Sequence, residues 1–482
     1  MLFNSYIYIL LFLPIALLGY YWLAKFSDSV SKTWLVLASL FFYAYWVPTY
    51  LFLIIGSMLG NYTLATNMLK ARSHPTLTPK TILILGIIFN FGLLGYYKYA
   101  DFFIANINLI SGFRLPLLRL LLPLAISFFT FQQIAYLMDV YQGKTQSYGL
   151  LNYALFVTFF PQLIAGPIVH HREMMPQFSN TKSRTFNPQN FSNGIFLFSL
   201  GLFKKVIIAD TFAIWANAGF EQTTPLTFFP AWATSLSYTF QIYFDFSGYT
   251  DMALGSAKLF NIHLPPNFNT PYCADNIQEF WRRWHMTLSR WLRDYLYIPL
   301  GGNRKGSGRT YINLMTTFLL GGLWHGAGWT FVIWGLLHGA GTSIHKYWSS
   351  RHFRLPTFIG WVGTFFFINL TWVFFRATSL EQATNILRSM AGFQGIVFPK
   401  QLRPFLTQFD LTYGKLFAGI GNAYEILLVT IIFGAFSICG KNSLELLDQY
   451  APNKKWTLAT TCILLYALNN LDKVSEFLYF NF

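Results

Sequence analysis

Short polar segments divide the sequence into apolar runs of about twenty residues, the length of an α-helix that crosses the hydrocarbon core of a bilayer. These runs occupy residues 5–24, 34–64, 81–100, 116–138, 150–169, 193–216, 228–255, 311–344, 357–375, 422–439 and 456–471. Two of them, 34–64 and 311–344, are too long for one crossing. Each is expected to be a hairpin or a re-entrant pair, broken near Pro48 and at Gly326 to Gly328. The chain is therefore predicted to be an all-α, polytopic membrane protein that forms one domain over residues 1–482.

Composition agrees with this class and argues against others. Hydrophobic residues make up 54% of the chain and charged residues only 11%, which excludes an ordinary soluble protein. The net charge of +16 comes from Lys and Arg in short loops between apolar runs, so it does not favour a nucleic-acid-binding protein. The three cysteines are too few and too scattered for a disulfide framework or a zinc site, and no metal site is predicted.

The basic loops predict the orientation of the chain. The first apolar run has no Lys or Arg before Lys25 and no small-residue cleavage pattern, so it is expected to be a retained helix with its N-terminus outside. Residues 281–310 hold seven basic residues against Asp294 alone and should face the cytoplasm. The same count places 346–354 and 441–455 inside and the C-terminal tail outside. It also requires residues 159–169 to dip into the membrane and return.

Residues 276–297 predict a basic, aromatic helix. Asn276 and Glu279 have the spacing of a capping box, and Pro299 follows the helix. Helical spacing places Arg283, Arg290 and Arg293 on one face, away from the aromatic side chains. Two interpretations remain open: an interfacial helix held by anionic lipid, or a cytoplasmic mouth that binds an anion such as the phosphates of coenzyme A.

A histidine lies within the apolar, glycine-rich segment GGLWHGAGW, residues 321–329. Ionisable groups at membrane depth are costly and usually functional, so His325 is a candidate general base for a hydroxyl that attacks a thioester. The flanking Trp324 and Trp329 are expected to wall its site. His285, forty residues earlier, is a candidate partner, whereas His338 is equally compatible with a structural role.

Three carboxylates also lie in apolar surroundings, at Asp139, Asp245 and Asp251. Such groups usually line a cavity or pair with a cation, so structural pairing is favoured over direct catalysis. The sequence contains no Walker A, GxSxG, HExxH or CxxC pattern, so nucleotide hydrolysis, serine-hydrolase chemistry and zinc catalysis lack their usual motifs.

Six segments together resemble the membrane-bound O-acyltransferase family, in the branch of alginate O-acetyltransferase and related bacterial envelope acetylation proteins. They are SFFTFQQIAYLMDVY (127–141), FFPQLIAGPIVHHREMMPQ (159–177), QIYFDFSGYTDMALG (241–255), NFNTPY to PLGGNRKG (267–306), GGLWHGAGWTFVIWGLLHG (321–339) and FLYFNF (477–482). The resemblance implies an inner-membrane protein with a central funnel and re-entrant segments. Such a protein takes an acyl group from a cytoplasmic donor and delivers it outward to an envelope polymer.

The resemblance also implies roles for individual residues. The histidine of the family's WHG motif corresponds to His325, and that of its RWHxTLS motif to His285. The tail 477–482 resembles a hexapeptide whose tyrosine, here Tyr479, carries the acyl group, although Asn481 replaces the usual Gln. We therefore expect acetyl-CoA as the donor substrate, with no bound cofactor. Four arginines are expected to bind it: Arg282, Arg283, Arg290 and Arg293. A separate extracytoplasmic acetyltransferase is the expected protein partner, and alginate is one candidate polymer.

Three other classes of function remain. A secondary transporter would explain broken helices, but it predicts internal repeats, which the sequence lacks. A membrane haem protein would use histidines such as His170, His171, His325 and His338 as axial ligands. A non-catalytic component of a polysaccharide modification or export machine needs no catalytic residue and predicts that changes at His325 and His285 are silent.

Overall fold

The structure is a computed structural model that describes residues 1–482 except 72–76, 146–147, 354, 406–410, 472–476 and 479–482. The described residues are mainly helical, and their β-structure consists of one parallel pair, β1 (Val397–Pro399) and β2 (Thr412–Gly414). The all-α class predicted from the sequence is therefore confirmed.

The N-terminal half contains η1 (Ile7–Phe12), α1 (Leu13–Leu23), α2 (Asp28–Ala44), α3 (Tyr50–Lys70), α4 (Pro79–Leu94), η2 (Gly95–Tyr99), α5 (Ala100–Ser111), α6 (Ile126–Tyr141), α7 (Leu150–Thr158), α8 (Phe160–Leu163), α9 (His171–Ser179), η3 (Thr181–Arg184), α10 (Pro188–Phe203), η4 (Lys204–Ala209) and α11 (Asp210–Phe220). The C-terminal half contains α12 (Phe228–Leu259), η5 (Pro271–Cys273), α13 (Ile277–Arg283), α14 (Met286–Leu292), η6 (Arg293–Tyr297), α15 (Gly306–His325), α16 (Trp329–Ser350), α17 (Thr357–Arg376), α18 (Leu380–Met390), η7 (Lys400–Phe405), α19 (Ala423–Cys439), α20 (Ser443–Gln449) and α21 (Lys454–Leu468).

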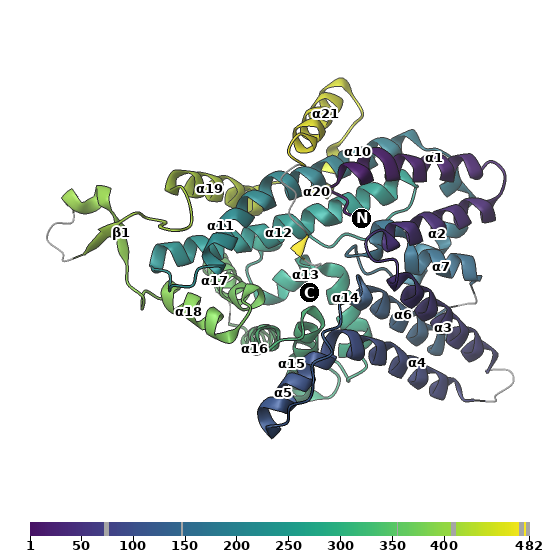
Figure 1. Ribbon diagram of the computed structural model, residues 1–482, viewed down its shortest axis with the longest axis horizontal. Coiled ribbons are helices and arrows are strands. Elements are labelled where there is room, and N and C mark those ends of the chain that lie inside the picture. Colours follow the sequence, from purple (N-terminus) through teal and green to yellow (C-terminus); the bar gives the residue numbers. More distant parts are fainter. Residues whose placement is uncertain (72–76, 146–147, 354, 406–410, 472–476, 479–482) are drawn as a thin grey trace.

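The long helix α12 is the centre of the fold. It runs beside α10 and α11 through the middle of the molecule in Figure 1, with α1, α2 and α7 beyond one end and α17 to α19 toward the other. Almost all of its residues are buried, including many that are polar. A helix that is buried on every side must satisfy these polar groups by contacts with its neighbours.

Glycines allow α12 to approach α10 at backbone distance. A Cβ atom added to Gly248 would lie 2.7 Å from the carbonyl oxygen of Gly201, and one added to Gly255 would lie 2.7 Å from that of Gly194. The reverse additions would clash in the same way, at 2.5 and 2.8 Å. Small residues are the usual means of close helix packing within a membrane.

Two buried ion pairs fasten η4 to α12. Lys204 pairs with Asp251 at 2.7 Å, and Lys205 pairs with Asp245 at 2.7 Å. The third carboxylate, Asp139 of α6, accepts a hydrogen bond from the Tyr295 hydroxyl at 2.9 Å. The three carboxylates are thus held by other side chains, as predicted from the sequence.

The predicted hairpins have the expected breaks. The run 34–64 is divided into α2 and α3 on either side of Pro48, and 311–344 is divided into α15 and α16 at Gly326 to Gly328. Helices α15 and α16 pack along their lengths, where a Cβ on Gly335 would lie 2.4 Å from the Phe318 carbonyl oxygen. The segment 159–169 is also irregular: after the short helix α8 the backbone is non-helical up to His170, while remaining buried.

Other predicted helices differ from the structure. Residues 116–123 are not helical, and 276–297 form three short helices instead of one. Asn276 does cap α13, since its side chain accepts from the backbone N–H of Glu279, but the Glu279 carboxylate contacts Arg283 instead of completing a capping box. Within the described residues, two helical stretches are long and apolar enough to cross a membrane, Pro79–Ser111 and Thr357–Arg376. The bent pair Ala423–Cys439 and Ser443–Gln449 would make a third.

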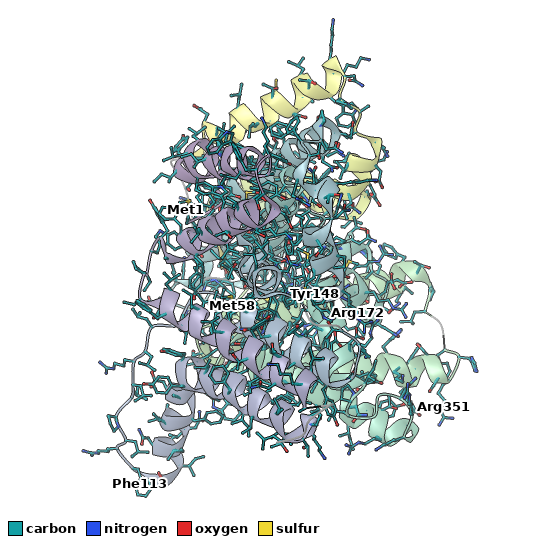
Figure 2. All side chains as sticks on the ribbon, turned by 90° about the vertical axis from the view of Figure 1, so that its right-hand side faces the viewer. Met1, Met58, Phe113, Tyr148, Arg172 and Arg351 are labelled. Atoms are coloured by element: carbon teal, nitrogen blue, oxygen red, sulfur yellow. The ribbon has the colours of Figure 1, made fainter. Side chains whose placement is uncertain are left out.

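Two basic segments, represented by Arg172 and Arg351, lie on the opposite side of the molecule in Figure 2 from Met1 and Phe113. Arg172 and Arg351 lie toward the right of Figure 2, whereas Met1 and Phe113 lie toward the left. The assignment of these two sides to cytoplasm and exterior stays a prediction.

Replacing Gly248 with alanine should destabilise the protein, because the new methyl group meets the Gly201 carbonyl. We expect a loss of about 1–3 kcal/mol, as for other overpacked sites, seen as a lower midpoint of thermal unfolding in detergent. Gly363→Ala is the matched control, since a Cβ there meets no atom within 4 Å. Equal unfolding midpoints for the two variants would contradict the close packing of α10 and α12.

Candidate functional site

His325 ends α15 and lies in the protein interior, 3% exposed. The rings of Trp324, Trp334 and Phe375 contact its imidazole edge-on, with centroid distances of 4.9, 5.2 and 5.1 Å. The prediction that Trp324 and Trp329 enclose His325 is therefore half correct. Trp324 is present, but Trp329 is 53% exposed and donates a hydrogen bond to Asn106, and Trp334 of α16 takes its place.

His285 occupies the break between α13 and α14. Its backbone is left-handed, with φ of 43° and ψ of 53°, a conformation that is uncommon for residues other than glycine and that is found at functional sites. Asn267 supports the break, because its carbonyl oxygen accepts from the Met286 N–H at 2.9 Å and its side chain accepts from the Thr287 hydroxyl at 2.6 Å. These contacts from Asn267 thus hold His285 in a non-helical backbone conformation between the two short helices.

These two breaks bring the candidate histidines together. The centroids of the His285 and His325 rings are 6.3 Å apart, and the Trp324 ring lies 6.1 Å from that of His285. His285 is fully buried, and Phe246 of α12 packs edge-on against it at 4.7 Å. The structure therefore contains a pair of buried imidazoles enclosed by aromatic rings.

His338 has a different environment, in which both ring nitrogens are occupied. The indole N–H of Trp281 donates to Nδ1 at 3.1 Å, and Nε2 lies 3.1 Å from the Thr371 hydroxyl. Since an indole can only donate, Nδ1 is the acceptor and Nε2 carries the proton. His338 therefore bridges α13 and α17 as a neutral ring, which favours its structural interpretation.

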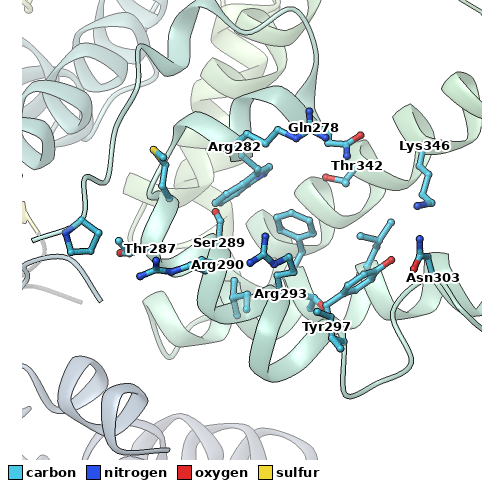
Figure 3. A pocket seen from close by; sticks show the side chains of 18 of the residues that line it. Gln278, Arg282, Thr287, Ser289, Arg290, Arg293, Tyr297, Asn303, Thr342 and Lys346 are labelled. Carbon is cyan, nitrogen blue, oxygen red and sulfur yellow. The ribbon is translucent and has the colours of Figure 1, made fainter. Parts of the chain in front are cut away.

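A cavity of about 760 Å³ lies beside the short helices α13, α14 and η6, the middle of α15 and the C-terminal part of α16. Figure 3 shows Arg282, Arg290, Arg293 and Lys346 around it, each from a different element: α13, α14, η6 and α16. These cations suit a ligand that carries phosphate or carboxylate groups. Lys346 was predicted only as part of a basic loop, because its place opposite the arginines depends on the α15–α16 hairpin.

The four arginines predicted to bind the ligand are not equivalent. Arg283 does not line the cavity but pairs with Glu279 at 2.8 Å, and this contact lowers the pKa of the Glu279 carboxyl. Arg290 lines the cavity but makes two hydrogen bonds to Glu173, at 2.5 and 2.9 Å. Arg293 pairs with the neighbouring Asp294, and Arg282 is the most exposed, with only a long contact to Glu279.

The cavity and the histidine pair are separated by aromatic side chains. Trp281 lines the cavity and contacts the Trp334 ring at 5.8 Å, and Trp334 in turn contacts His325. Neither His285 nor His325 is among the described residues that line the cavity. Trp281 and Trp334 therefore lie between this cavity and the imidazole of His325.

The described part of the C-terminal tail packs inside the protein. Phe477 is 1% exposed and stacks on Tyr249 of α12 with a centroid distance of 4.3 Å, and the Leu478 N–H donates to the Asp245 carboxylate at 3.0 Å. Phe246 contacts both Phe477 and His285. Tyr479, the predicted acyl carrier, lies outside the described residues.

Lys98 is a residue of the site that the sequence interpretation missed. Its ammonium group donates to the carbonyl oxygens of Trp324 at 2.6 Å and of His325 at 3.2 Å. The signal was available, since Lys98 is a lone cation within the apolar run 81–100. Its partner could not be inferred, because that requires the placement of η2 against the end of α15.

Comparison with known proteins gives a consistent result. A model of the membrane-bound O-acyltransferase family, MBOAT, matches residues 144–383. A peptidoglycan O-acetyltransferase of Helicobacter pylori is 48% identical over 100% of this chain and 98% of its own length. A probable alginate O-acetylase of Pseudomonas aeruginosa is 42% identical over 82% of this chain and 75% of its own length. A teichoic acid D-alanyltransferase of Bacillus subtilis is 29% identical over 42% of this chain and 53% of its own.

The two-point contact between Arg290 and Glu173 should stabilise the protein, whereas Arg282 should not. Arg290→Ala leaves the carboxylate of Glu173 without its partner, and we expect it to lower the free energy of unfolding by about 1 kcal/mol, since both side chains are partly exposed. The measurement is thermal unfolding in detergent. Arg282→Ala, which removes an exposed cation from the same cavity, is the control, and equal losses would argue against the structural role of Arg290.

Proposed function

The chain belongs to the membrane-bound O-acyltransferase family and is an O-acyltransferase, and on this basis we propose that it moves acetyl groups across a bacterial inner membrane for O-acetylation of an envelope polysaccharide. The donor is acetyl-CoA on the cytoplasmic side. The observation that carries the proposal is the pair of buried imidazoles, 6.3 Å apart, behind a cavity lined by cations.

The basic cavity is the proposed donor site. Its volume of about 760 Å³ is suited to a large ligand, and Arg282, Arg293 and Lys346 suit the phosphates of coenzyme A. Arg290 contributes to donor binding as part of the cavity wall. Arg283 contributes indirectly, because it holds the Glu279 carboxylate in place. In this arrangement the thioester end of the donor extends past Trp281 toward His325.

His325 is the proposed general base. Its imidazole takes the proton of an acceptor hydroxyl as the oxygen attacks the acetyl carbonyl carbon. The C–S bond of the tetrahedral intermediate then breaks, and the departing thiolate of coenzyme A takes the proton from the imidazolium. His285 assists by contacting the same reaction space, and the surrounding aromatic rings exclude water that would compete for the acetyl group.

Tyr479 is the proposed first acceptor. Leu478, its neighbour in sequence, is bound to Asp245, and Phe477 contacts Phe246, which in turn touches His285. A separate extracytoplasmic acetyltransferase then moves the acetyl group from the tyrosine ester to the polymer.

The final acceptor is proposed to be an envelope glycan. The relative that matches 100% of this chain and 98% of its own length is named for peptidoglycan, so peptidoglycan is the first acceptor to test and alginate the second. We also propose a single multi-pass domain over residues 1–482, with a central funnel. The buried, non-helical backbone at 164–169 supports a re-entrant segment there, anchored by the Ile168 N–H on the Thr287 hydroxyl at 2.9 Å.

His325→Ala should abolish acetylation of the polymer, because a general base contributes about 10²–10⁴ in rate. The assay is transfer of labelled acetyl groups into envelope polymer by cells that carry the variant, with immunoblotting to show that it accumulates in the membrane. His345→Ala is the matched control, since His345 lies in the last turns of α16, where its ring contacts the Ser349 hydroxyl. Undiminished acetylation by His325→Ala would favour a non-catalytic component instead.

Tyr479→Phe should prevent acetyl groups from attaching to the C-terminal peptide. Purified protein is incubated with labelled acetyl-CoA, and the mass of the intact C-terminal peptide is measured. The unchanged protein is expected to carry one acetyl group, and the Tyr479→Phe and His325→Ala variants none. Tyr466→Phe, which changes an exposed tyrosine of α21, controls for nonspecific acetylation. Label on the peptide of Tyr479→Phe would exclude tyrosine as the carrier.

A further inference from the structure

Lys98 makes three hydrogen bonds at the end of the helix that carries His325. Its ammonium nitrogen lies 2.6 Å from the Trp324 carbonyl oxygen, 3.2 Å from the His325 carbonyl oxygen and 3.2 Å from the Ser127 hydroxyl. The next residue, Tyr99, donates its hydroxyl proton to the Leu323 carbonyl oxygen at 2.7 Å. Two successive side chains of η2 therefore satisfy three successive carbonyl groups of α15.

The end of α15 requires such donors. The last four carbonyl groups of an α-helix have no partner within the helix, and together they form the negative end of its dipole. At this end the chain leaves the helix at once, because Gly326 has an extended backbone with φ of −159° and ψ of 148°. A cation at this position satisfies the carbonyl groups and compensates the dipole, so it restricts how the last residue of the helix can tilt.

The contacts of Lys98 also argue against a role as half of an ion pair. The nearby Asp101 uses its two carboxylate oxygens to accept from the backbone N–H groups of Leu118 and Arg119. Within the described part of the chain, no carboxylate forms an ion pair with Lys98, and its three acceptors equal the three N–H donors of an ammonium group. Placing a cation in an apolar helix at membrane depth is energetically costly. The presence of Lys98 there indicates a function at the helix end that it contacts.

We propose that Lys98 is a positioning residue for His325: it caps α15 and thereby holds the imidazole in the direction that proton transfer requires. This inference rests on the proposed function, because it assumes that His325 is the general base. Lys98 also borders a second cavity, of about 310 Å³, together with Gly326, Ala327 and Phe331. It does not line the basic cavity, so its loss should affect turnover without affecting donor binding.

The test compares Lys98→Met, which keeps much of the side-chain length but removes the donors, with Lys98→Arg, which keeps a cationic donor. Acetyl transfer from labelled acetyl-CoA into envelope polymer is followed in membrane vesicles from cells that carry each variant, so that the partner acetyltransferase and the acceptor are present. We expect Lys98→Met to lower kcat about tenfold to a hundredfold, the size of effect that a small misplacement of a catalytic group produces. The KM for acetyl-CoA should stay within about twofold of the unchanged protein, and Lys98→Arg should recover part of the lost kcat.

Three outcomes would overturn the proposal: wild-type kcat in Lys98→Met, a rise in KM that accounts for the whole loss, or equal impairment of the Met and Arg variants at equal thermal stability. If Lys98→Met does not accumulate, Lys98→Ala is assayed with and without propylamine, which can enter the second cavity. A higher turnover of Lys98→Ala in the presence of propylamine supports the proposal. Equal turnover with and without propylamine overturns it. The His325→Ala variant distinguishes failure of this inference from failure of the proposed function. An active His325→Ala variant would reject the proposed function itself.

Discussion

The fold depends on the cost of leaving a backbone or charged group without a partner in hydrocarbon. This constraint is greatest at α12, which carries many polar side chains and has almost no exposed surface, so its polar groups must find partners within the protein. Glycine pairs bring α10 to backbone distance, and Lys204 and Lys205 neutralise two of its carboxylates. Because these contacts make α12 rigid, Phe246 on the same helix can serve as a fixed support for both His285 and the tail.

The candidate site is built from interruptions of helices against that support. His325 stands where α15 stops, His285 where α13 and α14 meet in a left-handed residue, and Lys98 in the π-helical segment η2. A regular helix uses its backbone groups internally, whereas an interrupted one leaves groups that other segments can contact. The interruptions are therefore what allow three distant segments to meet at one pair of imidazoles.

Sequence patterns were sufficient for the helical class, the hairpin breaks near Pro48 and Gly326, and the candidate histidines, because these depend on local composition. The break at His285 was missed, since it is imposed by Asn267 through tertiary hydrogen bonds while the local pattern favours one continuous helix. The single face predicted for Arg283, Arg290 and Arg293 assumed the same continuous helix, whereas the three residues lie in separate short helices and Arg283 does not line the cavity. The places of Lys98 and Lys346 in the site could not be predicted, because they depend on which helix ends meet in the fold. No local sequence pattern supplies that information.

The hydrogen bond from Trp281 to His338 has a consequence for the resting enzyme. Trp281 stands between the basic cavity and His325, and its indole is tied to a histidine that is itself tied to Thr371. The indole cannot turn out of this position without losing its hydrogen bond to His338, so Trp281 is a fixed part of the wall between the cavity and the base. A donor whose thioester passes between the cavity and His325 would therefore have to break the hydrogen bond from Trp281 to His338.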